Sequence, residues 1–507
     1  MSGCGFTWCY LGRPPRRPHS RVAKSPQCAE RANRKPTFRL NGFGLRRNHD
    51  NVAMRAVEQP AHDRESGREV ASALICGGGL AGLAVAYQLC VRRGLRVFVV
   101  DPIGADGVGT GGASAVAAGL LHPFSPRMTR AWMGAEAFES AMRLVHSVQQ
   151  NERERGGNTS AEQPVWKNCG ILRLLRNDVQ VDQGRASANA FGPDEVQFLD
   201  ADQVCARMPP TDKSAAKNQF PGVFIPQGNV VDVPRYLRGL WRLCEQTGRA
   251  TWVKRAIGRD MGIHTLAAEL GVDHIVVAAG AWSKMLAAEE LATLGIVPVR
   301  GQNLHLTLCS DQSSTPTRDL EFALISEKYV VPGFVRNIHP DGKNCSELIC
   351  GATFEYARDG VTEDDLFDLA ADLSSPQIGN MCGFIEQNLY TAPVSLCGTD
   401  SERDPITATD IRRRAVAGVR AVPKRSHLGS VPYAGKSGDI WYLTALGSRG
   451  LLYHNFLAEA LADAVVDDDY RIIPSAARRA MAEEVEGRSE SISGLDSHAA
   501  SFAYETQ

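Results

Sequence analysis

The sequence predicts an α/β fold in which two domains are interleaved along the chain. Residues 73–101 read in order as a short apolar strand, a glycine-rich turn, a helix and a second buried strand, which is the pattern of a parallel α/β unit. Another strand, glycine turn and helix follow near the far end of the sequence, at residues 443–466. A chain of 507 residues is long enough for two or three domains, or for two domains whose segments alternate.

The composition is that of an ordinary globular protein, with 43% hydrophobic and 22% charged residues. A formal net charge of −1 provides no overall field that would attract nucleic acid or an anionic membrane. The longest apolar run, Ala73–Cys90, has a length that suggests a membrane span. Its glycine cluster divides the run into a short strand and a helix, so we predict no membrane span.

The thirteen cysteines are scattered along the sequence and include no CxxC pair. This pattern predicts reduced, mostly buried thiols in a cytosol-like compartment. We therefore expect neither a disulfide framework nor a zinc site, and we predict no other metal site.

Residues 1–70 differ from the rest of the chain. The stretches 12–27 and 31–48 are rich in Arg, Pro and Ser, contain no acidic residue and have no long apolar core. Such leaders are typical of organelle transit peptides, and the alternative is a disordered basic tail without an address. We expect a chloroplast first and a mitochondrion second, or the cytoplasm if translation starts at Met54. Residues 471–507 are predicted to form a polar tail, whose final stretch, 482–507, is loosely ordered.

The glycines that follow the first strand form a G-x-G-x-x-G motif. Gly77 allows a tight turn, Gly79 lets the backbone approach a pyrophosphate, and Gly82 lets the helix pack closely on the strand. Asp101 closes the second strand, where it would accept hydrogen bonds from ribose hydroxyls and favour FAD or NAD over NADP. The predicted dinucleotide contacts of this Rossmann-type unit are Gly77, Gly79, Leu80, Ala81, Gly82 and Asp101. The alternative is a cluster of glycines that serves only helix packing.

A segment after Asp101 indicates the family. The stretch GTGGASAVAAGLLHPFSP, Gly109–Pro126, together with the glycine motif resembles the D-amino-acid oxidase and glycine oxidase (DAO-type) family of FAD-dependent oxidoreductases. In that family a G-A-S-x-x-x-A-G segment passes the flavin, and Ser114 and Gly119 match its positions. Further segments resemble the family in the same order: 222–248, 274–283, 297–302, 329–333, 350–355 and 417–423. The resemblance extends over about residues 73–466.

The resemblance implies a Rossmann-type FAD-binding domain interleaved with a mostly antiparallel α+β substrate domain. The FAD-binding domain is expected from residues 71–125, 205–290 and 415–470, and the substrate domain from residues 126–204 and 291–414. The resemblance also implies cofactor contacts by Ser114, Gly119, Leu120, Gly280, Gly447, Ser448, Gly450 and Leu451.

Two branches of the family look most similar. The segments 222–228 and 445–451 are similar to the flavin half of the bacterial bifunctional enzyme that modifies a wobble uridine of tRNA. Glycine oxidases share the segment that contains Arg420. Only the basic leader precedes the glycine motif in this sequence, where the bacterial enzyme carries a methyltransferase half. With the near-zero net charge, this disfavours nucleic acid as a partner and leaves tRNA open.

The resemblance implies oxidation of a C–N bond in an amino acid or a secondary amine. In the family a hydride passes from the carbon next to nitrogen to flavin N5, the imine hydrolyses, and oxygen or another acceptor reoxidises the flavin. An amino-acid substrate needs a cation for its carboxylate, and the planar fork of arginine suits it. Arg420 matches the substrate-carboxylate arginine of glycine oxidases, and Arg449 matches a second arginine near the flavin. For each, the alternative is an ion pair at the surface or at a helix end.

Three further residues have two interpretations. Tyr329 lines the substrate pocket or belongs to the core, and His122 lies near the flavin or is a hydrogen-bonded structural residue. Arg300 serves a loop or the polar edge of the flavin, or else forms an ordinary ion pair.

The sequence departs from relatives of this family at three places. Sarcosine-oxidase relatives attach FAD through a cysteine in the segment that matches 419–423, and this chain has none there, which predicts non-covalent FAD. Lys424 and Arg425 replace an acidic residue and predict a basic substrate entrance. Residues 453–455, Tyr-His-Asn, replace a proline and are where an unusual substrate would be recognised.

Two other functions stay open at this point. One is a tRNA-modifying oxidase that acts on a carboxymethylaminomethyl group. The other is a non-catalytic flavoprotein that keeps FAD as part of its fold and assists assembly of a respiratory or photosynthetic complex.

Overall fold

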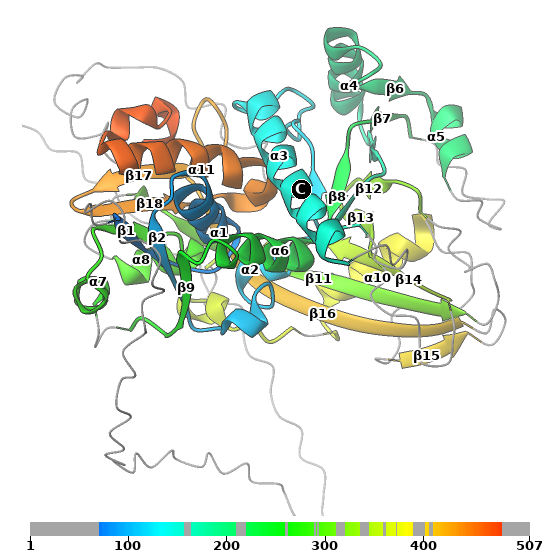
Figure 1. Cartoon of the computed structure of the whole chain (residues 1–507). Helices are drawn as coiled ribbons and strands as arrows, with labels where there is room; N and C mark the ends of the chain where they lie inside the picture. The colour runs from blue at the N-terminus through cyan, green and yellow to red at the C-terminus, as the bar shows by residue number, and fades with distance from the viewer. Residues whose placement is uncertain are drawn as a thin grey trace, which may run out of the picture. The chain divides into compact units, whose positions relative to one another are not determined.

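The computed structural model describes residues 70–156, 164–208, 220–258, 262–287, 291, 294–310, 320–334, 344–357, 361–371, 373–388, 401–404 and 409–478 (Figure 1). The predicted leader therefore lies outside the described residues apart from Val70, and only residues 471–478 of the predicted tail are described. In this described part of the chain, no helix has the length and hydropathy needed to cross a bilayer.

The first sheet is parallel apart from one edge strand. It contains, in spatial order, β17 (Tyr433–Ser437), β18 (Ile440–Thr444), β10 (His274–Val277), β1 (Ser72–Cys76), β2 (Arg96–Asp101) and β9 (Ala250–Lys254). Only β17 runs antiparallel to its neighbour. All five residues of β1 and all five of β18 are buried, as expected for parallel strands that are covered on both faces.

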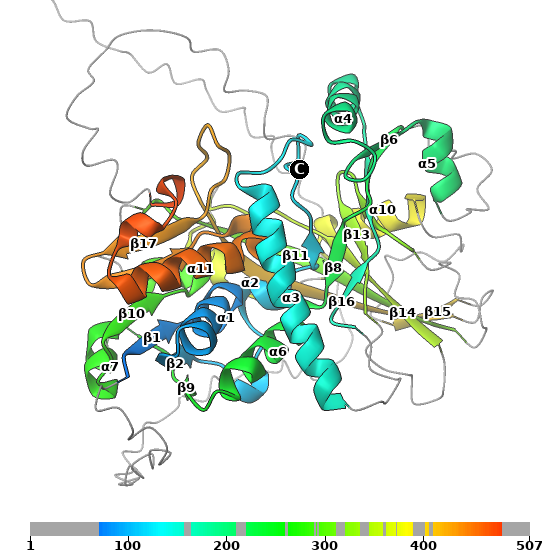
Figure 2. The same cartoon turned by 45° about the horizontal axis from the view of Figure 1, so that its top comes forward.

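Helices cover both faces of this sheet. On one face pack α1 (Leu80–Tyr87) with its π-helical extension η1 (Gln88–Arg92), α3 (Gly134–Gly156), α6 (Val233–Glu245) and α11 (Gly450–Asp467). Figure 2 shows α3 crossing beside α1, α6 and α11, which are in mutual contact. On the other face pack α7 (Ile263–Leu270), η3 (Gly280–Trp282) and α8 (Ser283–Leu286). The two faces of β1 are used alternately, since Ile75 joins the first core and Leu74 joins the second.

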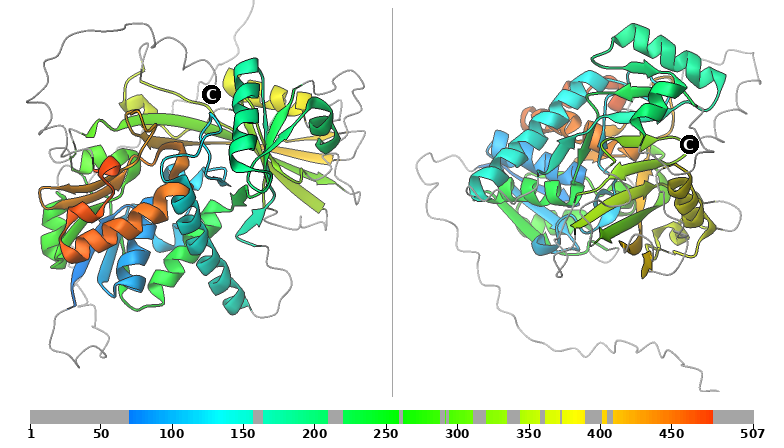
Figure 3. Two further views of the ribbon diagram at one scale, coloured as in Figure 1. Left: turned by 90° about the horizontal axis from the view of Figure 1, so that it is seen from above. Right: turned by 90° about the vertical axis from the view of Figure 1, so that its right-hand side faces the viewer.

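The second sheet is long and almost entirely antiparallel. It contains, in spatial order, β15 (Ser401–Asp404), β16 (Thr409–Val422), β11 (Val297–Ser310), β14 (Asn344–Gly351), β13 (Tyr329–Pro332), β12 (Ala323–Ile325), β5 (Ile171–Leu174), β7 (Gly222–Ile225) and β6 (Gln197–Leu199). Only β12 and β5 pair in parallel. The helix α10 (Pro376–Asn388) packs on one face, where Met381 and Ile385 meet apolar side chains of β11 and β14. Figure 3 shows this sheet beside the parallel sheet and its helices.

Shorter elements complete the described fold. They are η2 (Ala105–Gly107), α2 (Gly112–Ala115), β3 (Leu120–Leu121), β4 (Trp166–Asn168), α4 (Asp178–Phe191), α5 (Ala201–Arg207), β8 (Asn229–Val231), η5 (Asp364–Phe367), η6 (Gly447–Arg449), η7 (Tyr470–Ile472) and η8 (Ser475–Ala477). Strands β3, β8 and β4 form a small sheet of their own.

The segments of the two domains differ from the predicted bounds in three places. Strand β7 lies in the predicted FAD-binding segment 205–290 but pairs with β5 and β6 of the antiparallel sheet. Strand β16 crosses the predicted boundary at residue 415 and pairs along its whole length with β11. Helix α3 lies in a predicted substrate segment but packs on α11 and α6, because its apolar face completes the core of the parallel sheet.

The described start of the predicted tail, residues 471–478, packs on the core, and the stretch predicted to be loosely ordered, 482–507, lies outside the described residues. Ile473 and Ala477 are fully buried against the helices of the parallel sheet. The polar composition of residues 471–507 as a whole did not indicate these two buried positions.

The expectation that all cysteines are reduced is wrong for one pair. The antiparallel register places Cys309 on β11 directly opposite Cys345 on β14, and the two form a disulfide across a sequence separation of 36 residues. Facing positions on paired strands bring side chains close enough for such a bond. The other described cysteines form no disulfide.

Candidate active site

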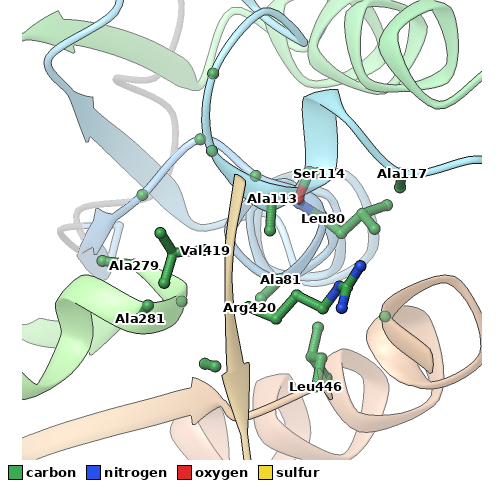
Figure 4. A pocket seen from close by; sticks show the side chains of 18 of the residues that line it. Leu80, Ala81, Ala113, Ser114, Ala117, Ala279, Ala281, Val419, Arg420 and Leu446 are labelled. Carbon is green, nitrogen blue, oxygen red and sulfur yellow. The ribbon is translucent and has the colours of Figure 1, made fainter. Parts of the chain in front are cut away.

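A cavity of about 760 Å³ extends from the glycine turn after β1 to the face of the antiparallel sheet (Figure 4). This volume is within the usual range for a cofactor or ligand site. One end is formed by Gly77–Ala81 and Asp101, and the other by Asn303, Tyr329 and Arg420. The cavity therefore joins the two sheets, and one elongated ligand would contact both.

The glycine turn is closed to larger residues. Gly77 has φ of +111°, and a Cβ there would lie 2.7 Å from the carbonyl oxygen of Ala278. A Cβ at Gly82 would overlap the carbonyl oxygen of Gly77. Helix α1 starts at Leu80 without a side-chain cap from Gly79. Backbone N–H groups of such a first turn have no partner within the helix, so the turn is suited to a pyrophosphate.

The loop after β2 is fixed by Asp101. Its Oδ2 accepts a hydrogen bond from Gly78 N at 2.8 Å, and its Oδ1 accepts one from Ile103 N at 2.9 Å. Trp252 on β9 donates its indole N–H to Ile103 O at 2.8 Å. Each oxygen of the Asp101 carboxylate keeps a further lone pair, which can accept a hydrogen bond from a ribose hydroxyl.

The middle of the cavity is lined by small residues. Strand β16 passes so close to α2 that a Cβ at Gly418 would lie 2.6 Å from Val116 Cγ2. Figure 4 shows Val419 and Arg420 on opposite sides of this strand, with Leu446, on the segment after β18, on the side of Arg420. Small side chains on several sides leave room for a broad planar ring. The labelled ones in Figure 4 include Ala81, Ala113, Ala117, Ala279 and Ala281.

Arg420 is desolvated and has no acidic partner among the described residues. Its Nη1 lies 3.5 Å from Thr353 O, and its guanidinium carbon lies 4.7 Å from the centre of the Phe354 ring. Burial lowers the pKa of Arg420, while Tyr329, Tyr356 and Glu355 act in the opposite direction. A buried cation without a paired carboxylate is costly and marks a candidate functional site.

The polar groups beside Arg420 form a short chain. Tyr329 donates its hydroxyl proton to Asn303 Oδ1 at 2.8 Å, and Asn303 Nδ2 donates to Val116 O at 2.6 Å. Burial raises the pKa of Tyr329 to about 12, which Arg420 partly counters. The phenol therefore stays neutral at physiological pH, and Tyr329 lines the cavity rather than only the core.

Arg300 forms an ordinary ion pair. It pairs with Glu355 and also donates to Asp368 O at 2.7 Å and to Ala370 O at 2.5 Å. It does not line the cavity. Of its two predicted roles, the ion pair agrees with this geometry.

Arg449 and His122 do not line the cavity. Arg449 is the N-cap of α11 and does not line the cavity, although Ser448 and Gly450 on either side of it do. Burial, with smaller effects of Arg449 and Arg173, lowers the pKa of His122 to about 3. His122 is thus neutral, and its Nδ1 accepts a hydrogen bond from Phe124 N at 3.3 Å.

Most of the predicted contacts meet in this cavity. The residues that line it are Gly77, Gly79, Leu80, Ala81, Asp101, Ser114, Gly119, Leu120, Gly280, Arg420, Gly447, Ser448, Gly450 and Leu451. Ser114 also accepts a hydrogen bond through Oγ from Leu80 N at 3.1 Å. Gly82 and Arg449 do not line it: Gly82 packs against Gly77, and Arg449 is the N-cap of α11.

Several lining residues were not predicted. They include Gly78, Pro102, Ile103, Gly107–Gly112, Trp252, Arg255–Ile257, Asn303, Ala352, Phe354 and Leu369. Strand β9 pairs in parallel with β2, and the carboxyl ends of neighbouring parallel strands meet at one edge. That rule would have found Arg255–Ile257 once β9 was recognised as the next strand of the sheet.

The predicted role of residues 453–455 in substrate recognition is wrong. Tyr453 donates its hydroxyl proton to Trp132 O at 2.8 Å, and His454 Nε2 lies 2.7 Å from the Tyr236 hydroxyl. Asn455 accepts from Gln88 at 2.9 Å. All three are buried between helices, because this first turn of α11 faces α3, α6 and α1 rather than the cavity.

Among the described residues, no group of three His, Cys, Asp or Glu side chains is arranged to hold a metal ion.

Comparison with known proteins points to one family. A family model described as DAO, FAD dependent oxidoreductase, matches residues 72–464. The bifunctional protein ThiO/ThiG of Nostoc sp. is 25% identical over 278 residues, which are 52% of this chain and 38% of that protein. The tRNA 5-methylaminomethyl-2-thiouridine biosynthesis bifunctional protein MnmC of Chromobacterium violaceum is 25% identical over 306 residues, which are 58% of this chain and 40% of that protein. The matches thus span less than half the length of these two relatives.

Solved structures share the fold. Glycine oxidase from Geobacillus kaustophilus aligns with a TM-score of 0.57 at 16% identity, over 80% of this chain and 97% of that chain. L-proline dehydrogenase from P. horikoshii aligns with a TM-score of 0.56 at 16% identity, over 82% of this chain and 99% of that chain. At these identities the likeness establishes the architecture alone.

Proposed function

Because the chain belongs to the DAO family of FAD-dependent oxidoreductases, we propose that it oxidises a C–N bond of an amino acid or a secondary amine that carries a carboxylate. The observation that carries this proposal is Arg420. Its guanidinium is desolvated, has no ion pair among the described residues and lines the cavity that would hold the cofactor. A planar cation in this state is suited to bind a carboxylate through both oxygens.

The residues of the cavity fit FAD. Gly77–Ala81 present a turn that excludes side chains and a helix start whose N-cap, Gly79, has no capping side chain, and Asp101 offers acceptors for ribose hydroxyls. The small residues around Ala113–Gly119 and β16 leave room for a planar ring. When it is bound, FAD supplies the two-electron acceptor that the oxidation of a C–N bond requires.

The residues at the ring end would orient the substrate. Arg420 would hold the carboxylate. The proton of Tyr329 is already donated to Asn303, so the phenol oxygen is left as an acceptor for an N–H of the amine. Phe354 and Leu369 line the same region and would exclude water from the bound substrate.

The cavity offers no general base at this end. Among the described lining residues, Asp101 is the only carboxylate, and there is no histidine or lysine. Asp101 is committed to the glycine turn at the opposite end. The amine would therefore have to lose its proton to solvent before it reacts, and kcat/KM should rise with pH as the free amine is formed.

We place non-covalent FAD within the same proposal. Cys76 is the only described cysteine that lines the cavity, and it lies at the end of β1, by the glycine turn. Burial raises the pKa of its thiol to about 12, so it is a poor nucleophile. Heat or acid precipitation should release the flavin into the supernatant, and flavin that stays with the precipitate would contradict non-covalent binding.

The proposed activity is tested by anaerobic flavin bleaching. The purified holoprotein is mixed with a panel of amino acids and N-alkyl amino acids, and flavin absorbance is followed with dithionite as the positive control. At least one amine with a carboxylate should bleach the flavin. Flavin that dithionite reduces but that no amine reduces would argue against the proposal and favour the non-catalytic role in complex assembly.

An amine carried by tRNA is a second candidate. It is favoured by the MnmC of Hahella chejuensis, which is 25% identical over 438 residues, or 83% of this chain and 60% of that protein. A carboxymethylaminomethyl group also has a carboxylate that Arg420 could hold. The net charge of −1 speaks against a nucleic-acid surface. Accumulation of that modified base in tRNA after loss of the gene would favour this candidate over a free amine.

A chloroplast location is also part of the proposal, with a mitochondrion as the second choice. It rests on the basic, acid-poor stretches within residues 1–70. A fluorescent protein fused behind these residues should enter the organelle, whereas a fusion that starts at Met54 should remain in the cytoplasm. Equal distribution of the two fusions would contradict the address.

A further inference from the structure

A third arginine lies on the cavity face of the antiparallel sheet. The register aligns one row of residues across five neighbouring strands, namely Arg173, Ile325, Tyr329, Gly351 and Asn303. Residues that face each other on paired strands project from the same side of a sheet. Tyr329 and Asn303 line the cavity and Arg173 does not, so Arg173 projects from the same side of the sheet, beyond the Tyr329 end of the cavity.

The five aligned residues form a continuous surface. The Tyr329 hydroxyl reaches Asn303 across Gly351, where a Cβ would lie 2.5 Å from the phenol oxygen. Ile325 packs with Tyr329 in the core cluster on this face. Arg173 is two strands beyond Tyr329, or about 10 Å at the usual strand spacing.

Arg449, at the start of α11, lies between the lining residues Ser448 and Gly450 and is an electrostatic neighbour of Arg173. Burial lowers the pKa of Arg173, and the next cause is the charge of Arg449. Both arginines also lower the pKa of His122, so the two guanidinium groups and this neutral imidazole are electrostatic neighbours. Arg425 at the predicted basic entrance acts on Arg449 in turn.

Neither arginine has an acidic partner in the described part of the chain. No carboxylate contributes to the surroundings of Arg173 or Arg449, and neither side chain has a hydrogen bond. Arg176, three residues further along, is different: its Nε donates to Ser326 Oγ at 2.8 Å, and its guanidinium stacks on the Phe220 ring at 4.4 Å. The absence of partners is thus particular to the cavity side.

Two desolvated cations near each other destabilise a fold unless a bound anion neutralises their charge. Arg420 packs its guanidinium over Gly301 of β11, and Arg173 stands on β5, with three strands between β11 and β5. Tyr329 on β13 lies between them. Arg420 therefore lies at one end of this row of residues and Arg173 lies at the other.

From this arrangement we infer that Arg173 and Arg449 form a second anion subsite, and that the substrate is an amine with two acid groups, one held by Arg420 and the other by Arg173 and Arg449. The inference rests on the proposed function for the amine. The four strand spacings from β11 to β5 amount to about 19 Å, and the length of an arginine side chain at each end shortens the distance that a ligand has to span. The acid groups should therefore be several bonds apart.

The test uses ligands that contain no amine, so that its outcome does not depend on catalysis. Butoxyacetate has one carboxylate, and (3-carboxypropoxy)acetate has a second one at the end of a chain of the same length. Binding of each to the holoprotein is measured by calorimetry and by the change in flavin absorbance. A series with one to four additional methylenes measures the separation of the two subsites.

The wild-type protein should bind the best dicarboxylate at least about tenfold more tightly than its monocarboxylate match, as expected for a charge-assisted contact. Arg173→Gln should remove this preference and leave the monocarboxylate within about twofold. Arg173→Lys should restore part of it, and Arg176→Gln should leave it unchanged. Arg420→Gln should weaken both ligands.

Three results would overturn the second subsite: equal binding of both ligands by the wild-type protein at every chain length, equal weakening of both by Arg173→Gln, or no effect of Arg173→Gln on either. The thermal midpoint of each variant with bound FAD verifies that it folds. Failure of every amine to bleach the flavin, with the dicarboxylate preference intact, would refute the proposed oxidation and support the subsite.

Discussion

Arg420 and Arg300 allow a comparison between an arginine proposed to bind a ligand and an arginine that stabilises the fold. They lie on the adjacent strands β16 and β11, where Arg420 faces Val299 and Arg300 faces Val419. Arg300 pairs with Glu355 and donates to two carbonyl oxygens at 2.7 and 2.5 Å. Arg420 has one contact to a carbonyl oxygen, at 3.5 Å.

The two substitutions to methionine should have opposite effects on stability. Arg300→Met removes a largely buried ion pair and leaves Glu355 without it, so we expect the free energy of unfolding to fall by about 2–4 kcal/mol. Arg420→Met removes a desolvated charge that has no paired carboxylate among the described residues, so stability should be unchanged or higher by about 1 kcal/mol. Binding of a carboxylate ligand should fall roughly tenfold to a hundredfold in Arg420→Met.

Urea unfolding of the two holoproteins, followed by intrinsic fluorescence, gives the order of stability. Titration of flavin absorbance with a carboxylate ligand gives the affinity. The reasoning is refuted if Arg420→Met unfolds as early as Arg300→Met, because Arg420 would then be a structural cation. Unchanged ligand affinity in Arg420→Met would remove it from the substrate site.

Three further predictions concern the cofactor end, the buried core and the substrate amine. Gly82→Ala should abolish FAD retention, since a Cβ there overlaps the turn. The flavin-to-protein absorbance ratio measures this, and Gly383→Ala, where a Cβ meets nothing within 4 Å, should retain FAD. Burial lowers the pKa of His454 to about 4, below the unfolded value near 6.5. Its contribution is therefore present above pH 6.5 and is lost as pH falls toward 4, by up to about 2 kcal/mol between pH 7 and 5. His454→Gln should flatten the measured pH dependence of unfolding, and an unchanged slope would exclude His454 as its source. Finally, kcat/KM should rise with pH along the titration of the substrate amine, so two substrates whose amines have different pKa values should give displaced profiles; identical profiles would indicate a base on the protein.

The cofactor end was predictable because its signals are local. A glycine motif between a strand and a helix, with Asp101 closing the next strand, specifies a turn by short-range geometry. The predicted α/β fold and the DAO family are both confirmed. The role of Arg420 was predictable from a family segment. The structure was needed to show that it has no paired carboxylate among the described residues.

The features that sequence reasoning missed depend on register between distant strands. Arg173 is aligned with Tyr329 through β12, and Cys309 lies opposite Cys345 on the paired strands β11 and β14. A shift of one residue in any of these pairings would turn the side chains to the other face. Residues 453–455 were misassigned for a related reason, because the orientation of α11 decides which side of its first turn faces the cavity.

The central claim is that this FAD-dependent fold oxidises an amine whose carboxylate is held by Arg420. The most direct measurement is the anaerobic rate of flavin bleaching by a matched pair, an N-alkylglycine and the same amine without its carboxylate, in the wild-type protein and in Arg420→Met. We predict that the wild-type protein reacts at least about tenfold faster with the carboxylate-bearing amine and that Arg420→Met loses this preference. Equal rates for the two amines in the wild-type protein, or the same preference in both proteins, would contradict it.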